Sequence, residues 1–163
     1  MIVLARGETT KNRVSADTYL TEGAPLVEGD RVQLQQVVLN LILNAVEAVG
    51  SVQEGPRELS ISTEQIQANG VRVAVRDTGP GIDAGHLERI FEAFYTTKSG
   101  GVGMGLSICR AIIDAHGGRL WAEANEPHSS VFQFTLPDAE GKLMSSLQPA
   151  SYIDSEMRDD NHR

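Results

Sequence analysis

The feature of this sequence that most constrains the fold is a long apolar helix, LQQVVLNLILNAVEAV, at residues 34–49. A helix that is apolar on nearly every side has to be buried, so the chain must supply another layer to pack against it. Asn40 and Asn44 nevertheless lie one turn apart in its middle. Asn is about 0.6 kcal/mol less favourable than Ala in a helix interior, and a buried amide without a partner costs roughly 1–3 kcal/mol more. We therefore expect both asparagines to face a polar group.

The two asparagines belong to a polar stripe on this helix. Its members follow one another at spacings of three, four, four and three residues, and they are Gln33, Gln36, Asn40, Asn44 and Glu47. At about 100° per residue they cover a band roughly 60° wide on one side of the helix. The amides could bond to neighbouring backbone inside the core. Alternatively, they could form one wall of a ligand pocket, where amide oxygens and a carboxylate hold a hydrated cation.

The composition indicates an ordinary globular domain with a core, since 40% of the 163 residues are hydrophobic and 22% are charged. The formal net charge of −8 argues against a surface for nucleic acid or anionic lipid, because both need clustered Lys and Arg. The single cysteine, Cys109, excludes an internal disulfide framework and a multi-cysteine metal site. Because no run approaches about 18 apolar residues and no signal pattern opens the chain, we expect a cytoplasmic domain without membrane contact.

The remaining patterns predict an α+β fold. Alternating segments predict strands over residues 13–23, 57–66, 70–78, 119–126 and 130–137. Asp30 is the predicted N-cap of a helix that ends at Val49 with Gly50 as C-cap, and residues 83–95 and 106–116 are predicted to form further helices. This order predicts a two-layer sandwich in which helices cover one face of a mixed, largely antiparallel sheet.

Two glycine-rich stretches add candidate ligand contacts. In RDTGPGI, Asp77 ends a strand and Gly79–Pro80–Gly81 turns the backbone sharply. This is either a simple strand-ending turn, or Asp77 accepts a hydrogen bond from an amine such as adenine N6. In SGGVGMGLSICRA, four glycines precede a helix whose first N–H groups favour an anion, and Lys98 stands just before them. That run is either a flexible loop and cap, or a loop that folds over a triphosphate.

The stretch ERIFEAFYTTK leads directly into the second glycine run. At helical spacing, Phe91 and Phe94 are predicted to be core anchors. Only the polar end of the stretch, Thr96, Thr97 and Lys98, is expected to reach a ligand.

These four stretches, in this order, resemble the catalytic ATP-binding domain of two-component sensor histidine kinases. That family belongs to the superfamily shared with gyrase, MutL and the heat-shock chaperone ATPases, which has the Bergerat ATP-binding fold. QVVLNLILNAVEA resembles the asparagine box, RDTGPGI the first glycine box, FEAFYTTK the phenylalanine box, GVGMGLSICRAIIDAHGG the second glycine box, and SSVFQFTLP the terminal strand. The resemblance covers about residues 13–137, and the wording is most similar to that of nitrogen- and oxygen-sensing kinases.

The resemblance implies ATP and Mg²⁺ as cofactors. Asn44 would bind Mg²⁺ that bridges the phosphates, Asn40 would lie near phosphate, Asp77 would bind the adenine amine, and Lys98 would meet the terminal phosphates. Asn40, Asn44 and Lys98 are thus the implied catalytic residues. The implied nucleotide contacts are Asn44, Glu47, Asp77, Gly79, Gly81, Ile82, Thr97, Lys98, Gly101, Val102, Gly103, Met104, Gly105 and Leu106. On this interpretation, the buried amides of the helix are satisfied only when the site is filled or wet.

Asn40 also bears on the reaction that the resemblance implies. Hydrolysing relatives have a glutamate at the matching position, and an amide cannot take a proton from water. The site is therefore expected to hold ATP for transfer to a histidine on a dimerisation domain, and from there to the receiver domain of a response regulator. The alternatives are a hydrolysing ATPase, a serine kinase of the same superfamily, and a binding module that nucleotide only gates.

The sequence departs from the family pattern in three places. None of the four histidines has the context of a phosphoacceptor, so the dimerisation helices are expected to be absent. Residues 1–12 are expected to be a linker or the end of a preceding helix, too short for the helix that usually precedes the first strand. Ser129 and Ser130 stand where the terminal strand usually opens with Gly. Residues 138–163 lack periodicity and are expected to form a flexible tail.

Overall fold

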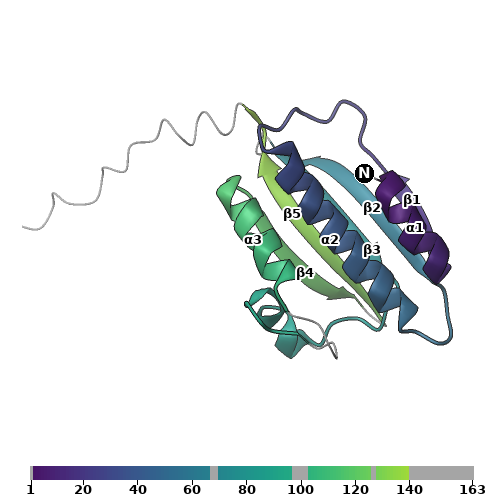
Figure 1. The fold of residues 1–163 in the computed structure, drawn as a ribbon. Helices are drawn as coiled ribbons and strands as arrows, with labels where there is room; N and C mark the ends of the chain where they lie inside the picture. Colours follow the sequence, from purple (N-terminus) through teal and green to yellow (C-terminus); the bar gives the residue numbers. More distant parts are fainter. Residues whose placement is uncertain (1, 67–69, 97–102, 126–127, 140–163) are drawn as a thin grey trace, which may run out of the picture.

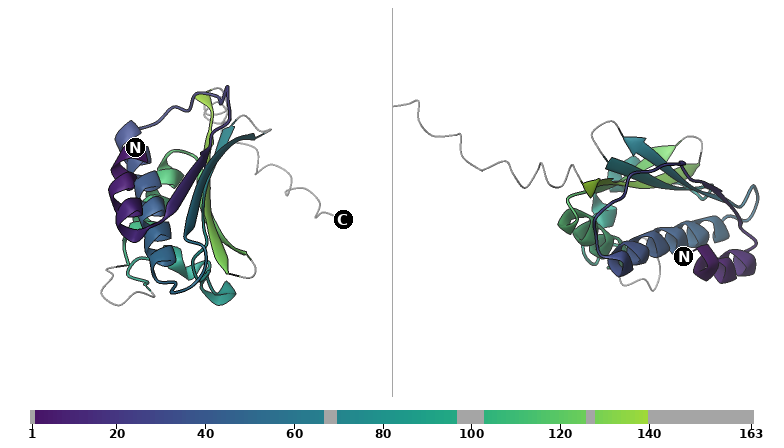
Figure 2. Two further views of the ribbon diagram at one scale, coloured as in Figure 1. Left: turned by 90° about the vertical axis from the view of Figure 1, so that its right-hand side faces the viewer. Right: turned by 90° about the horizontal axis from the view of Figure 1, so that it is seen from above.

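The computed structural model of this protein describes residues 2–66, 70–96, 103–125 and 128–139. In this part of the chain, a five-stranded sheet forms one layer and helices form the other (Figure 1). Figure 2 shows the layers edge-on, with the described helices together on one side of the sheet. The predicted two-layer α+β sandwich is therefore confirmed.

The sheet has the strand order β1-β2-β3-β5-β4 and is mixed, as predicted. The first two strands are parallel and the other neighbouring pairs are antiparallel; the strands are β1 (Ser15–Tyr19), β2 (Glu58–Ile66), β3 (Gly70–Asp77), β4 (Arg119–Asn125) and β5 (Ser129–Pro137). Its central strand, β3, ends at Asp77, which lies opposite Leu59 of β2 and Ser130 of β5. The end of β3 is thus held by a neighbouring strand on each side.

The long apolar helix is α2 (Arg31–Gly50), which lies across the middle of the sheet (Figure 1). Asp30 caps it as predicted, because its Oδ1 accepts hydrogen bonds from the backbone N–H groups of Val32 at 2.9 Å and Gln33 at 3.0 Å. The helix ends one residue later than predicted, with Ser51 as the C-cap. By length and composition alone α2 could cross a membrane, but its buried residues pack into the core, as they do in an ordinary core helix.

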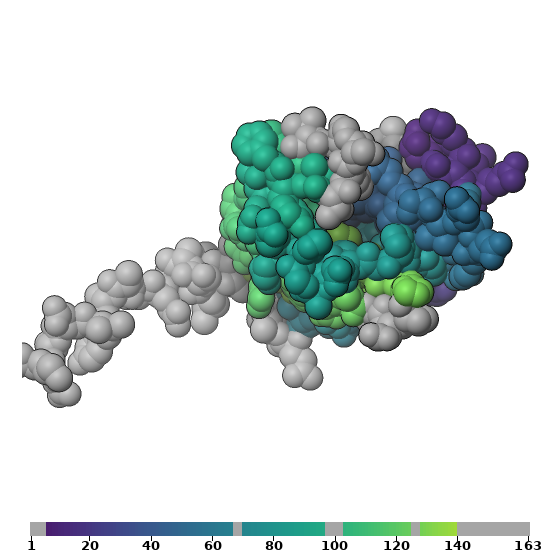
Figure 3. All heavy atoms as spheres, turned by 90° about the horizontal axis from the view of Figure 1, so that it is seen from below, coloured from purple at the N-terminus to yellow at the C-terminus, as the bar shows by residue number. Residues whose placement is uncertain are grey.

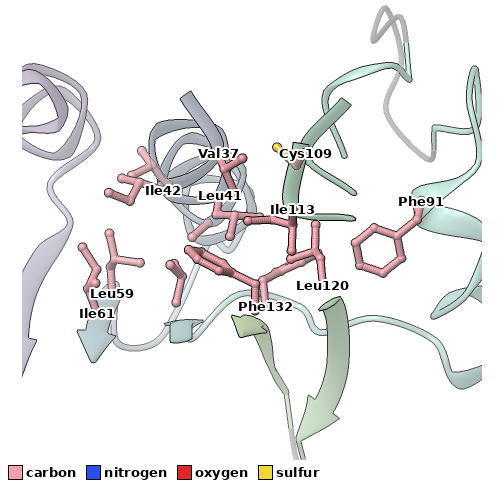
Figure 4. Packing of buried hydrophobic residues seen from close by; sticks show 14 of the residues in the cluster. Val37, Leu41, Ile42, Leu59, Ile61, Phe91, Cys109, Ile113, Leu120 and Phe132 are labelled. Atoms are coloured by element: carbon pink, nitrogen blue, oxygen red, sulfur yellow. The ribbon is translucent and has the colours of Figure 1, made fainter. Parts of the chain in front are cut away.

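The core lies between the sheet, α2 and α3 (Gly105–Ala115). In Figure 4, Leu41 of α2 and Ile113 of α3 meet above Phe132 of β5. Leu41 and Ile113 are fully buried, at 0% exposure. Burial of this apolar surface is the main stabilisation of the two-layer arrangement.

His116, just after α3, joins the two core helices at the end of the molecule where α2 begins. Its Nε2 accepts a hydrogen bond from the backbone N–H of Asp30 at 3.0 Å, and its Nδ1 lies 2.7 Å from the carbonyl oxygen of Ile112. With Nε2 as the acceptor, Nδ1 is the ring nitrogen that donates to the Ile112 carbonyl. These two bonds give His116 a structural role.

Residues 1–12 were expected to be either a linker or the end of a preceding helix. Residues 2–12 are helical, so the linker alternative is wrong, and they are long enough for a helix before the first strand. Residues Ile2–Asn12 form α1, which packs against α2. Thr9 of α1 is buried, and its carbonyl accepts a hydrogen bond from the backbone N–H of Val14 at 2.9 Å. The Arg57 guanidinium also bonds to the carbonyls of Asn12 at 3.3 Å and Val52 at 2.9 Å. Tertiary contacts therefore hold a helix whose sequence has little amphipathic pattern.

The helix predicted at residues 83–95 is also wrong. That segment forms two single 3₁₀ turns, η1 (Ala84–His86) and η2 (Arg89–Phe91). Beyond η2, Phe94 adopts a positive φ of 66° and donates its backbone N–H to the carbonyl of Gly103 at 2.9 Å. A bond to a distant residue thus replaces the helical bonds that the local sequence would allow. Phe91 is buried as predicted, but Phe94 is 72% exposed and is not a core anchor.

Candidate functional site

A cavity of about 420 Å³ lies at the end of the molecule where α2 finishes. Its described lining comes from the last turns of α2, the loop after β3, η2, the start of α3 and the start of β5, and comprises Asn44, Glu47, Ala48, Ser51, Asp77, Pro80, Gly81, Ile82, Ile90, Leu106, Ser130 and Phe132. Figure 3 looks onto this end, where a hollow lies between the atoms of α2 and those of the segment after β3. The asparagine helix and the first glycine stretch therefore meet at one cavity.

Asp77 forms the polar floor of this cavity. Its side chain is only 1% exposed, and both carboxylate oxygens accept hydrogen bonds. Oδ1 accepts from the backbone N–H of Gly79 at 2.8 Å, and Oδ2 accepts from the Ser130 hydroxyl at 2.6 Å. Burial raises the pKa of Asp77 above its ordinary value, while these two hydrogen bonds act in the opposite direction.

The glycine turn after Asp77 brings the backbone close to α2. A Cβ at Gly79 would lie 2.9 Å from the Cβ of Ala48 and 2.7 Å from Oδ1 of Asp77, so only glycine fits there without movement. Gly81 has a positive φ of 81°, which L side chains rarely adopt. Thr78 anchors the turn, because its hydroxyl donates to the carbonyl of Pro56 at 2.7 Å. The turn is therefore shaped by close packing as well as by chain reversal.

The polar stripe of α2 divides between two surroundings. Asn44 and Glu47 line the cavity. Asn40 lies one turn earlier and is not part of the described lining; its Nδ2 donates to Sγ of buried Cys109 at 3.6 Å. Gln33 and Gln36 are exposed to solvent. The stripe thus runs from solvent, past α3, to the cavity.

The helix amides are less buried than expected. The sequence predicted buried amides that are satisfied only when the site is filled or wet, whereas Asn40 and Asn44 are both half-buried. Among the described residues, no buried side-chain nitrogen or oxygen lacks a hydrogen-bond partner. Asn40 is only half-buried and has its bond to Cys109, and Asn44 is also half-buried and has an interaction of its own. Burial raises the pKa of the Cys109 thiol, so the sulfur stays neutral and acts as a weak acceptor.

The second glycine stretch is described only from Gly103 onward. Gly103 has a φ of 71°, and a Cβ there would lie 2.7 Å from the backbone of Phe94. Met104 and Gly105 begin α3 without lining the cavity, whereas Leu106 lines it. The predicted contacts Thr97, Lys98, Gly101 and Val102 lie outside the described residues, so their roles stay predictions.

Ser130 is a member of the site that sequence reasoning missed. It was noted only as a departure from the usual glycine, yet it is 3% exposed and bonded to Asp77. The register of β3 and β5 pairs these two residues, and pairing between strands so far apart in sequence is not visible in either motif. Further lining residues that were not predicted are Ala48, Ser51, Pro80, Ile90 and Phe132.

The charges around the cavity bear on the ligand it can accept. Among its described lining residues, Glu47 and Asp77 are acidic and there is no Lys or Arg. No group of three or more His, Cys, Asp and Glu in the described part of the chain could hold a metal ion by itself. The described lining therefore offers carboxylate and amide oxygens to a cation, and no positively charged side chain to an anion.

Comparison with known proteins places this geometry in a family. The model of the histidine kinase-, DNA gyrase B-, and HSP90-like ATPase family matches residues 29–140, which include the whole described cavity. The chain belongs to this family, and within it to the ATP-binding catalytic domains of sensor histidine kinases.

The relatives in sequence are sensor kinases. The chain is 45% identical over 136 residues to the sensor protein FixL of Bradyrhizobium diazoefficiens, which covers 83% of this chain and 26% of FixL. It is 37% identical over 136 residues to the sensor histidine kinase TmoS of Ectopseudomonas mendocina, which covers 83% of this chain and 14% of TmoS. The chain thus spans about a quarter or less of the length of these relatives.

Solved structures agree with this assignment. The nucleotide-free catalytic domain of the histidine kinase ThkA has a TM-score of 0.72 and 38% identity, over 83% of this chain and 86% of that one. Full-length ShkA in complex with AMPPNP has a TM-score of 0.72 and 28% identity, over 82% of this chain and 27% of that one. ThkA in complex with the response regulator protein TrrA has a TM-score of 0.70 and 36% identity, over 86% of this chain and 39% of that one.

Proposed function

We propose that this domain binds Mg²⁺–ATP in the cavity above Asp77 and donates the γ-phosphoryl group to a histidine on a separate dimerisation domain, from which it passes to an aspartate of a response regulator. This proposal includes the dimerisation domain and the response regulator as partners, Mg²⁺ as the metal, and the roles given below to individual residues. The domain would act in the cytoplasm, as one unit of a longer sensor kinase.

The observation that carries the proposal is the buried carboxylate of Asp77. A carboxylate offers about four acceptor positions, and Gly79 and Ser130 occupy two of them. The remaining capacity suits an amine donor such as adenine N6. Apolar neighbours at this cavity, Ile82 and Phe132, would pack against a flat ring, in keeping with ligand sites that combine apolar walls with a few polar anchors.

The acidic lining is the reason to include a divalent cation. A triphosphate next to Glu47 and Asp77 would be repelled unless its charge were neutralised. Asn44, on the lining, would contribute an amide oxygen to Mg²⁺, and the phosphates and water would supply the other ligands. Lys98 would add a positive charge at the terminal phosphates. The chemistry expected of the metal is neutralisation of the phosphate charge during transfer.

The phosphoacceptor is proposed to lie on another domain. Three histidines lie in the described residues. His116 is buried and held by two hydrogen bonds, His86 stacks edge-on against Tyr95 at 5.9 Å, and His128 is exposed in the turn before β5. ThkA was solved with a response regulator protein bound, which supports a receiver domain as the final acceptor. Asn40, with an amide where hydrolysing relatives carry a carboxylate, would keep loss of ATP to water slow.

Phosphotransfer assays test this function. The 163-residue chain with Mg²⁺–ATP is expected to bind nucleotide without labelling itself. Added dimerisation domain from the same parent protein should become labelled, with phosphate that is labile in acid and stable in base. Asn44→Ala should abolish the label, and Arg119→Met, on the opposite face of the sheet, should not. Acid-stable label on serine would favour the serine kinase, and steady phosphate release without label would favour the hydrolase.

A further inference from the structure

Arg110 of α3 makes two contacts to the segment around η2 that the proposed function does not use. Its guanidinium carbon lies 4.3 Å from the centre of the Phe91 ring, which is a cation–π geometry. Its Nη2 lies 3.5 Å from Oε2 of Glu88, immediately before η2. A single side chain therefore connects α3 to both the start and the end of this turn.

The two elements joined by Arg110 each supply an apolar lining residue of the cavity. Leu106 precedes Arg110 by four residues, so both side chains lie on the same face of α3. Ile90 precedes Phe91 and lines the cavity, as Leu106 does. Phe91 also packs edge-on against Phe132, another lining residue, with ring centres 6.3 Å apart. The position of Arg110 relative to η2 thus bears on how Ile90 and Leu106 line the cavity.

The η2 turn needs support from outside itself. It is a single 3₁₀ turn of three residues, and turns of this length have weak internal hydrogen bonding. The bond from the Phe91 N–H to the Glu88 carbonyl is 3.3 Å long, which is at the long end for this type. Phe91 is nevertheless only 4% exposed. The stem and guanidinium of Arg110 provide part of the cover for this ring.

We infer that Arg110 is a positioning residue for nucleotide binding. It holds η2 against α3 through the Phe91 ring, and so sets the position of Ile90 relative to Leu106 on the cavity lining. It does not itself line the cavity, and its effect on nucleotide passes through Phe91. The inference rests on the proposed function, because it assigns a consequence for nucleotide to this contact.

The test compares three variants of the 163-residue chain by calorimetric titration with Mg²⁺–AMPPNP. Arg110→Met keeps a long apolar stem and removes the charge over the ring, so affinity should fall about 3- to 10-fold. Arg110→Lys keeps a cation over the ring and should stay within about 3-fold of the original. The control is Arg119→Met. The guanidinium carbon of Arg119 lies 5.7 Å from the centre of the Trp121 ring, and neither residue lines the described cavity, so the affinity of this variant for nucleotide should be unchanged.

A double-variant cycle separates positioning from general destabilisation. If Arg110 acts through the ring, Arg110→Met should cause no further loss of affinity once Phe91→Leu is present. In the nucleotide-free protein, NMR methyl signals of Ile90 and Leu106 should shift in Arg110→Met and not in Arg119→Met. Any one of three results would overturn the inference. The affinity of Arg110→Met could stay within about 2-fold of the original, the methyl signals could stay in place, or Arg110→Met could cause its full loss of affinity in the Phe91→Leu background as well.

The two hypotheses can fail separately. If the unaltered chain binds no nucleotide, the proposed function fails, while the methyl shifts still decide whether Arg110 positions Ile90 relative to Leu106. If the unaltered chain binds nucleotide and Arg110→Met binds equally well, only the role of Arg110 is lost.

Discussion

The floor and the wall of the cavity are built in different ways. The floor is the end of the central strand, where Asp77 is 1% exposed and bonded at 2.8 Å and 2.6 Å to Gly79 and Ser130. The wall is built from single turns and from the start of α3. Just after η2, Phe94 has a positive φ of 66° and is 72% exposed, and its backbone N–H bonds to the carbonyl of Gly103.

The floor is built for selective binding of the ligand, whereas the wall is built to change position around it. Groups fixed by a sheet keep their geometry whether or not a ligand is present, which favours selective binding. Turns held by a few contacts can change position at low cost, as loops that close over substrates do. We therefore expect changes in the floor to act on affinity or on the whole fold, and changes in the wall to act mainly on the shape of the cavity.

The largest effect should come from Asp77→Asn in the floor. Loss of a charged acceptor for the adenine amine should weaken Mg²⁺–ATP binding about 10- to 100-fold, as measured by calorimetry. The melting temperature of the empty protein should hardly change or should rise. Burial raises the pKa of Asp77, which means that burying the ionised carboxylate costs stability, and the neutral amide of Asn does not carry this cost. A large fall in melting temperature would make Asp77 a structural turn residue.

The dependence of stability on pH also tests whether burial of the Asp77 carboxylate costs stability. Since its folded pKa is raised above the ordinary value of 3.8, its protonated form stabilises the fold at pH below that value, and this stability is lost as pH rises through the folded pKa. The free energy of unfolding of the original protein minus that of Asp77→Asn should therefore decrease as pH rises from about 4 to 7. Urea titrations at several pH values measure this difference, and an increase with pH would contradict it.

Gly79→Ala should have the next largest effect, and on stability. The new Cβ would lie 2.9 Å from the Cβ of Ala48, so the floor must shift. The free energy of unfolding should fall by about 1–3 kcal/mol, as for other overpacked positions. The control is Gly105→Ala, at the start of α3, where a Cβ meets nothing within 4 Å. If the two variants are equally stable in urea titrations, the floor can shift to accept the extra methyl group without loss of stability.

The sequence predicted the floor far better than the wall. The alternation of β3 and the Asp77–Gly79 pattern depend on local preferences for strands and turns, and these agree with the fold. The Asp30 cap of α2 is likewise local, because its partners are two and three residues away. Such features can be read from a single segment, since both partners lie in it.

The wall depends on contacts between distant segments. Residues 83–95 have helical spacing, but the bond of Phe94 to Gly103 and the contact of Arg110 with Phe91 favour separate turns. The Ser130–Asp77 bond was missed for the same reason, since it joins residues 53 positions apart. Local preference also failed at α1, where packing against α2 stabilises a helix with little amphipathic pattern.

Ser130→Ala probes the floor more gently. It removes the hydroxyl that donates to Asp77, so the pKa of Asp77 should rise further, and the less firmly oriented carboxylate should bind nucleotide about 3- to 10-fold more weakly. Carboxyl carbon NMR can follow the titration of Asp77, and calorimetry the affinity. Ser129→Ala is the matched control one residue away, on the other side of the strand. If both variants behave alike, the hydroxyl does not orient Asp77.

The smallest effect is expected from Asn40→Ala, because Asn40 lies between α2 and α3 beside the cavity and not on its described lining. Asn40 donates to Cys109 of α3 at 3.6 Å and does not line the described cavity, whereas Asn44, one turn later, does. Loss of a weak bond to sulfur should lower the free energy of unfolding by about 0.5–1 kcal/mol and change the affinity for Mg²⁺–AMPPNP less than about 3-fold. Asn44→Ala should reduce that affinity much more. If the two variants lose affinity equally, Asn40 turns from Cys109 toward the ligand when the wall closes, and the helix would then belong to the adaptable part of the site.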